Sequence, residues 1–236
     1  MSSKTVQSLI WGWFGLTSLA LACVLVVGAP YKPACALYSV ALTITGYAFY
    51  ISEMFPDAGV VPAKPHPITW AAFAIFTAVG AAAQFLKGSG ILGCACLYLT
   101  AIGCAAIAVI SARRFSWQWS FWSKLLIAFA GLLFVLSMIM GFDPHLATAA
   151  ALAATGSDLC SYYPMVDKTI KQPHEESIRN LFFNSVKCVP QLIAEPFPLT
   201  VATSIYLLML TVVNGGFALF IWWWRKRVPK PVAVTN

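Results

Sequence analysis

The sequence predicts an all-α, polytopic membrane protein with about eight transmembrane helices in two parallel repeats. Hydrophobic side chains make up 60% of the 236 residues and charged ones only 10%, whereas soluble domains carry about 25% charged residues. Apolar stretches of about 20 residues, the length that a helix needs to cross a bilayer, recur along the chain. A shift of 108 positions brings several stretches into register, which indicates a duplicated unit.

Eight stretches are long and apolar enough to be predicted as transmembrane helices. The seventh is the least hydrophobic, and a seven-span protein would leave it in a loop. The predicted spans cover roughly residues 7–28, 34–55, 68–86, 91–111, 124–141, 146–163, 177–193 and 199–224.

The distribution of basic residues favours eight spans and predicts their orientation. With eight spans, 12 Lys and Arg residues fall on one side of the membrane, and only Lys32 and Lys87 fall on the other. Because cytoplasmic loops carry the excess of Lys and Arg, both termini are predicted to be cytoplasmic. If the seventh segment did not cross, the basic cluster at 225–230 would move to the poor side. The expected location is therefore the plasma (inner) membrane, with lipids as partners.

The tryptophans support the same orientation, because their amphipathic rings favour the membrane interface. The sequence places nine of them at the cytoplasmic edge: Trp11, Trp13, Trp70, Trp117, Trp119, Trp122, Trp222, Trp223 and Trp224. The net charge of +7 comes from short basic clusters between apolar runs, and no continuous basic stripe is present. Nucleic acid is therefore not an expected partner, and the sequence leaves self-association as a homo-oligomer open.

The internal repeat divides the chain into parts. Under the offset of 108, Pro56 falls on Pro164, Pro65-His66 on Pro173-His174, and residues 97–99 on 205–207. Four crossings separate matching points, so the two units have the same orientation. We expect an N-terminal helix (1–30), a first three-helix repeat (31–115), a linker helix (116–143), and a second three-helix repeat with a basic cytoplasmic tail (144–236).

Each unit has a helix ended by proline, then a basic loop and a polar restart, and this pattern resembles the PQ-loop superfamily. That group includes the SWEET sugar carriers and, more distantly, the Pnu-type nicotinamide riboside carriers. The matching pieces are residues 163–177 and, more weakly, 55–69. The glutamine that names the loop is Met165 in one half and Asp57 in the other. The chain is also similar to uncharacterised bacterial membrane proteins with a Pro-His loop in each half, a likeness that implies no activity. The resemblance to the carriers implies two three-helix bundles joined by an inverting helix.

Polar residues inside the predicted spans are the candidate binding residues, because ionisable groups are costly in a bilayer. Asn180, Asn184, Lys187 and Gln191 follow helical spacing and share one face of the seventh span. At a rise of about 1.5 Å per residue, Lys187 lies roughly 15 Å from the cytoplasmic end and Asp158 roughly 9 Å.

We expect Asp158 and Lys187 to be paired directly or through water. Asn184, Gln191 and Asn214 are expected to complete a polar pocket between the two halves. In SWEET-like carriers an asparagine on the last helix contributes to the substrate site, and the resemblance implies that role for Asn214. Its repeat partner is Ala106, so the sequence does not carry a symmetric pair of asparagines.

Other polar residues are expected to have structural roles. Asn180 and Gln84 are predicted to fasten helices by hydrogen bonds. His66 and His174 are expected to cap or pack the loops. Glu175 and Glu176 are predicted to lie in the first turn of a helix, where negative charge is favourable.

No catalytic or metal-binding motif is recognisable in the sequence. It contains no HExxH, no GxSxG and no cluster of carboxylates suited to group transfer. Its seven cysteines lie in or beside apolar segments, which argues against a disulfide framework or a metal site. We therefore expect no enzyme activity and no cofactor. The favoured function is a small secondary transporter or facilitator of a polar metabolite, and the alternative is a scaffold or assembly factor acting through its cytoplasmic loops.

Overall fold

The computed structural model describes residues 2–27, 30–115, 146–195 and 199–229, with isolated positions between 116 and 145. Every regular element within these ranges is helical. The predicted linker helix at 116–143 lies largely outside the described residues. The helices are α1 (Ser3–Val27), α2 (Tyr31–Met54), α3 (Pro67–Gln84), α4 (Gly90–Arg114), α6 (Ala147–Ser161), α7 (Tyr163–Lys171), α8 (Ile178–Val186), α9 (Cys188–Ala194) and α10 (Val201–Arg225).

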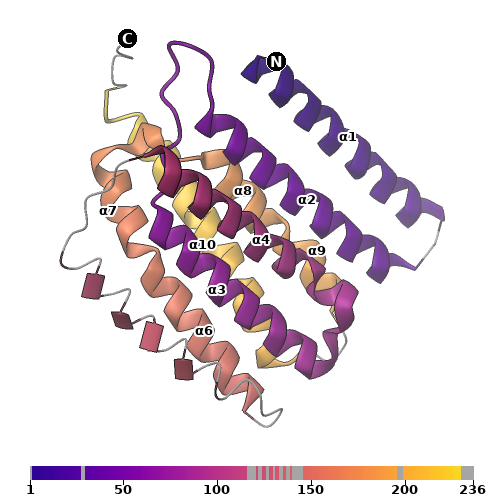
Figure 1. The fold of residues 1–236 in the computed structure, drawn as a ribbon. Coiled ribbons are helices and arrows are strands. Elements are labelled where there is room, and N and C mark those ends of the chain that lie inside the picture. The colour runs from indigo at the N-terminus through magenta and orange to yellow at the C-terminus, as the bar shows by residue number, and fades with distance from the viewer. Residues whose placement is uncertain are drawn as a thin grey trace.

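Four helical stretches among the described residues are long and apolar enough to cross a membrane: Ser3–Val27, Tyr31–Met54, Pro67–Arg114 and Thr203–Arg225. The third is a hairpin of α3 and α4, which run side by side in opposite directions (Figure 1). A short π-helical turn, Phe85–Ser89, joins them. Gly88 and Gly90 take φ values of 94° and 70° there, which residues with a side chain rarely adopt. Large apolar side chains such as Val26 and Ile91 are exposed on the outside of the bundle, as expected for contact with lipid.

The charged loop predicted after Pro164 is instead helical. Helical structure continues past Pro164, which stands in the first turn of α7. A proline is tolerated there because the first N–H groups of a helix have no acceptor within the helix. The helix α7 carries Asp167, Lys168 and Lys171. A 3-10 turn, Pro173–Glu175, follows it.

The seventh predicted span begins at the expected place but is divided into two helices. Ser177 is the N-cap of α8 and accepts a hydrogen bond from the Asn180 N–H at 3.2 Å. Glu175 and Glu176 therefore precede the helix, and the prediction that they stabilise its first turn is wrong. The helix is interrupted at Lys187, between α8 and α9. Pro190 lacks the N–H that a regular helix would donate four residues back, which explains an interruption at this place.

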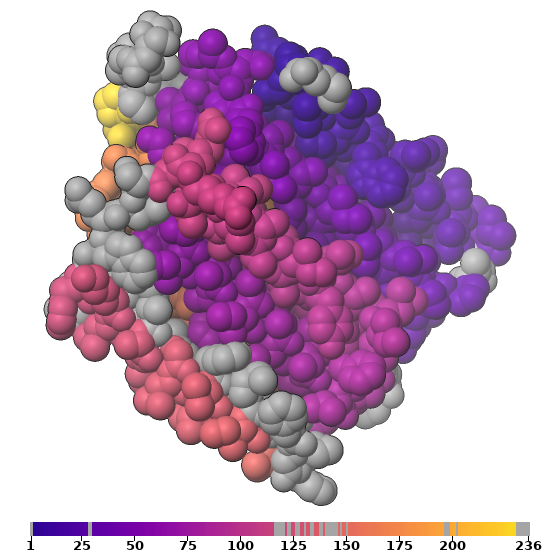
Figure 2. Space-filling view, in the orientation of Figure 1, coloured from indigo at the N-terminus to yellow at the C-terminus, as the bar shows by residue number. Residues whose placement is uncertain are grey.

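Helices of the first half pack against helices of the second half. From the first half, α2 packs against α8 and α3 packs against α6, so the contacts cross between halves. The helix α10 packs against α6, α8 and α9, and α1 lies on the outer side of α2 (Figure 1). In the space-filling view α4 occupies the front, with α1 and α2 to one side and α6 to the other (Figure 2). The main core cluster draws on both halves and includes Tyr50, Ile107, Met165 and Ile221.

A glycine sets the distance between α2 and α8. A Cβ atom at Gly46 would lie 2.9 Å from the Cβ of Phe183. The Phe183 Cβ is bonded directly to the backbone of α8, so it cannot swing aside. Gly216 on α10, in contrast, has open space around it.

We expect Gly46→Ala to destabilise the protein by about 1–3 kcal/mol, because the two helices must separate to admit the methyl group. The measurement is thermal unfolding of the purified protein in detergent. Gly216→Ala is the control and should leave the unfolding midpoint near that of the unmodified chain. Equal midpoints for the two variants would contradict the close α2–α8 contact.

Candidate functional site

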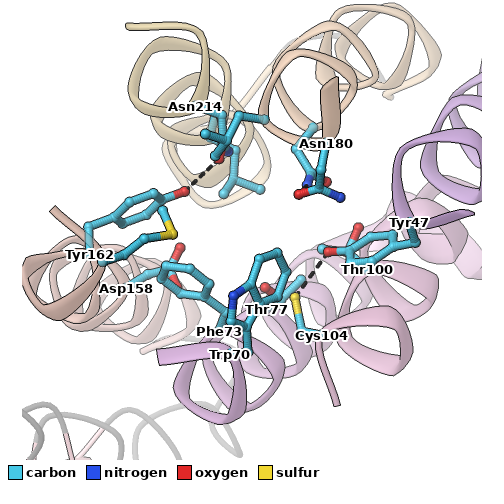
Figure 3. A pocket seen from close by; sticks show the side chains of 14 residues that line it. Tyr47, Trp70, Phe73, Thr77, Thr100, Cys104, Asp158, Tyr162, Asn180 and Asn214 are labelled. Carbon is cyan, nitrogen blue, oxygen red and sulfur yellow. Dashed lines mark hydrogen bonds between the residues drawn. The ribbon is translucent and has the colours of Figure 1, made fainter. Parts of the chain in front are cut away.

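A small cavity lies among helices from both halves of the chain. Its volume is about 20 Å³, which is room for about one water molecule. Its polar lining comes from α2, α3, α4, α6, α8 and α10 (Figure 3). These residues are Tyr47, Thr77, Thr100, Asp158, Tyr162, Asn180, Asn184 and Asn214.

Asp158 is one wall of this cavity and is only 1% exposed. Its Oδ2 accepts a hydrogen bond from the Tyr206 hydroxyl at 3.2 Å. That hydroxyl also contacts the Thr77 hydroxyl at 2.8 Å. Asp158 Oδ1 has no hydrogen-bond partner in the described part of the chain. A buried carboxylate oxygen without a partner is costly, so this atom is a candidate for contact with a ligand or water.

Lys187 is fully buried but bonds to other groups than Asp158. Its Nζ donates to Asn184 Oδ1 at 2.6 Å and to the Thr100 hydroxyl, and it lies 5.5 Å from the centre of the Tyr47 ring. No ion pair joins it to Asp158 within the described ranges. The predicted direct pair is therefore wrong, because the lysine extends toward α4 while Asp158 bonds toward α10. A water-mediated link stays a prediction.

The two asparagines of α8 extend the lysine's hydrogen bonds to the cavity. Asn184 Nδ2 donates to Asn180 Oδ1 at 2.8 Å. Asn180 Nδ2 is buried and has no acceptor in the part of the chain that the structure describes. Asn180, expected only to fasten helices, therefore presents an unused donor at the cavity.

Asn214 lines the cavity, as the predicted pocket requires. Its Oδ1 accepts from the Tyr162 hydroxyl at 2.9 Å, and its Nδ2 donates to the Leu210 carbonyl at 2.9 Å. Gln191 does not belong to this group. It lies one turn beyond Lys187, away from the cavity, and its Nε2 donates to Glu195 Oε1 at 3.3 Å.

Several lining residues were not recognisable from the sequence. Trp70, predicted to lie at the membrane interface, is 2% exposed and forms part of the cavity wall with Phe73. Tyr47 and Thr100 also line it. Aromatic and small polar residues in an apolar helix carry no mark of such a position, and only packing against other helices reveals it.

At each end of the bundle, buried glutamate side chains form hydrogen bonds between helices and loops. We call residues 55–66 and 172–177 the Pro-His end. There Lys64 Nζ contacts Glu175 Oε1 at 2.6 Å, and the Tyr50 hydroxyl donates to Glu176 Oε1 at 2.6 Å. Lys168 donates to the carbonyls of Lys64 and Glu175. These bonds connect the Pro-His loop of one half to that of the other.

At the other end, Glu195 is the centre of a second set of hydrogen bonds. It is 2% exposed, and its side chain accepts from the Ser89 hydroxyl and from Gln191. Lys32 Nζ donates to its carbonyl at 3.1 Å. Gln84 Nε2 donates to the Thr203 carbonyl at 3.0 Å, as expected of a residue that fastens helices.

The histidines of the Pro-His end are packed into the loops. The Thr69 hydroxyl lies 3.4 Å from His66 Nδ1, and His174 Nε2 lies 3.0 Å from the Val228 carbonyl. Burial, together with the positive charge of Lys168, lowers the pKa of His66 to about 4. His66 is therefore neutral at physiological pH.

The described residues contain no group of three or more His, Cys, Asp or Glu side chains placed to hold a metal ion. Among the residues that line the cavity, Asp158 Oδ1, Asn180 Nδ2 and Trp70 Nε1 have no hydrogen-bond partner in the described part of the chain, which suits a small polar solute. Comparison with protein-family models, curated proteins and solved structures finds no match to this chain.

The lowered pKa of His66 predicts a loss of stability in mild acid. Between pH 6.5 and 4 the unfolded chain binds a proton at this histidine and the folded chain does not, so stability falls as pH falls. Thermal unfolding in detergent across that range should show a smaller decline for His66→Asn, which keeps a polar atom near Thr69. His174→Gln serves as the matched control and should retain the decline of the unmodified protein. A decline in His66→Asn as large as in the unmodified protein would contradict the assignment.

Proposed function

We propose that the chain is a small secondary transporter or facilitator of a polar metabolite, with its substrate site at the cavity. The observation that carries the proposal is the pair of unused polar atoms, Asp158 Oδ1 and Asn180 Nδ2, in a lining drawn from both halves. Polar groups at such a depth are costly in a bilayer and are retained where a substrate or ion passes. Sites between repeats are also typical of secondary transporters.

The proposal includes eight spans in two parallel repeats, with both termini cytoplasmic in the plasma membrane. The offset of 108 pairs α2 with α6, α3 with α8 and α9, and α4 with α10. A parallel repeat predicts that contacts between halves come in equivalent pairs, and the α2–α8 and α3–α6 contacts are such a pair. The resemblance to the PQ-loop superfamily is part of the same proposal.

Alternating access requires that one end of the bundle open while the other stays closed. The two sets of carboxylate bonds, at Glu175 and Glu176 and at Glu195, are the groups that would separate in turn. The cavity has room for about one water molecule, as expected for a closed state of a transporter. The helices would have to move apart to admit a metabolite.

Uptake of candidate polar metabolites into proteoliposomes tests the proposal. Asp158→Leu, Lys187→Met and Asn214→Leu should each lower the uptake rate at least about tenfold, because each leaves a buried partner unsatisfied or removes a substrate contact. Gly216→Ala is the matched control and should transport normally. Since the apolar variants can also affect folding, each is compared only if it elutes as a single species in gel filtration. Unchanged uptake in all three would refute the site assignment.

A scaffold or assembly factor is the second candidate, and a recess at the Pro-His end favours it. This recess has a volume of about 870 Å³, and its charged lining includes Glu53, Asp57, Arg179 and Arg225. Such a surface suits a polar segment of a partner protein. In that case Arg179→Ala would abolish partner recovery from detergent-solubilised membranes, whereas the cavity variants would have no effect.

A further inference from the structure

The cavity has an aromatic side with a carboxyl group in it. The ring centres of Phe73 and Tyr162 are 4.6 Å apart, and those of Trp70 and Phe73 are 5.8 Å apart. All three rings line the cavity together with Asp158 (Figure 3). Aromatic faces and a carboxylate each attract a positive charge, and the attraction to aromatic rings grows when water is excluded.

The carboxyl group has unused bonding capacity on this side. Asp158 receives a single hydrogen bond, from Tyr206, and its Oδ1 receives none from the described residues. No described Lys or Arg forms an ion pair with it. A buried carboxyl group stays ionised only where a positive partner or several donors offset its desolvation, and an ammonium group supplies both.

The other side of the cavity has the opposite character. Asn180, Thr100 and Tyr47 face Asp158 and Tyr162 across it (Figure 3). Lys187 stands behind this side, with its Nζ bonded to Asn184 and Thr100. No carboxyl group lines this side of the cavity to attract a cation, and the Asn180 Nδ2 donor has no acceptor among the described residues.

We infer that the cavity binds a small organic ammonium compound that carries a neutral hydrogen-bond acceptor at its other end, such as an amino alcohol. The ammonium group bonds to Asp158 Oδ1 against the aromatic rings, and the hydroxyl or carbonyl oxygen accepts from Asn180. A neutral sugar would leave the carboxylate without a counter-charge, and an anion would be repelled by it. The inference deepens the proposed function, on which it rests for transport but not for binding.

The size of the cavity limits the ligand to a few heavy atoms. Even a small amine needs a larger volume than 20 Å³, so side chains of the lining must move when it binds. Met165, a flexible side chain that is 1% exposed, lines the cavity and can change its rotamer more readily than the rings.

Binding of ethanolamine to the purified full-length protein in detergent tests the inference. Its uncharged isostere, 1-propanol, has the same number of heavy atoms and the same hydroxyl group but no ammonium. Isothermal titration should show saturable binding of ethanolamine, and 1-propanol should bind at least about tenfold more weakly, because a hydrogen-bonded charge is lost. Asp158→Asn should weaken ethanolamine binding by a similar factor. Glu53→Gln, which changes a carboxyl group outside the cavity, should bind as the unmodified protein does.

Two results would overturn the inference: equal binding of ethanolamine and 1-propanol, or unchanged ethanolamine binding in Asp158→Asn. If Asp158→Asn does not fold, Trp70→Leu replaces it, since it keeps the carboxyl group and removes the largest ring. Several-fold weaker binding is then expected, and unchanged binding contradicts the aromatic part of the site.

Flux measurements separate this inference from the proposed function. Uptake of other polar solutes without any binding of ethanolamine would refute the inference but support the proposed transport function. Ethanolamine binding that depends on Asp158, with no flux of any solute, would refute the transporter and leave the binding site standing.

Discussion

The structure depends on one constraint: polar side chains inside an apolar bundle must find their partners within the protein. Lys187 meets this constraint through Asn184 and Thr100, and Asn214 meets it through Tyr162. These bonds tie the end of α8 to α4, and α10 to the junction of α6 and α7, so satisfying the polar groups also orders the helices. Some buried polar atoms lack partners among the described residues, and two of these, Asp158 Oδ1 and Asn180 Nδ2, are informative because both residues line one cavity.

The separation of Asp158 and Lys187 has consequences for recognition. A direct Asp158–Lys187 pair would have neutralised both groups and left the cavity with little electrostatic preference. Because Lys187 is held by the oxygens of Asn184 and Thr100 instead, Asp158 and Lys187 stay apart on opposite sides of the cavity. A ligand with one positive end and one acceptor end then gains from both sides at once, whereas a uniformly charged ligand gains from one and loses at the other.

The Pro-His loops are connected to the cavity through α8. Lys64 and Glu175 belong to different halves, and their contact holds the loops together over the ends of α2 and α7. Glu176 accepts a hydrogen bond from the Tyr50 hydroxyl of α2. This bond fixes the start of α8, the helix that carries Asn180 and Asn184. A movement of these loops would be transmitted to the cavity along α8. This connection gives the loops a part in both proposed functions, as a gate in a transporter or as the binding surface of a scaffold.

The residues chosen from the sequence were partly brought together by the structure. Asp158, Asn184 and Asn214 line one cavity, Lys187 stands directly behind it, and Gln191 belongs to the Glu195 end. Helical spacing correctly placed Asn180, Asn184 and Lys187 next to one another, and hydrogen bonds join their side chains. It could not indicate how far along that face the cavity extends, or that Pro190 divides the helix at Lys187.

The sequence by itself determined that the protein is helical and apolar enough for a membrane, because length and hydropathy of each segment are local properties. It also determined which residues are too polar to face lipid. Only the tertiary structure decided the partner of each polar group, because a side chain on one helix can reach several neighbours and the packing selects among them. Trp70 and Asn180 became part of the cavity, and Lys187 turned away from Asp158, for that reason.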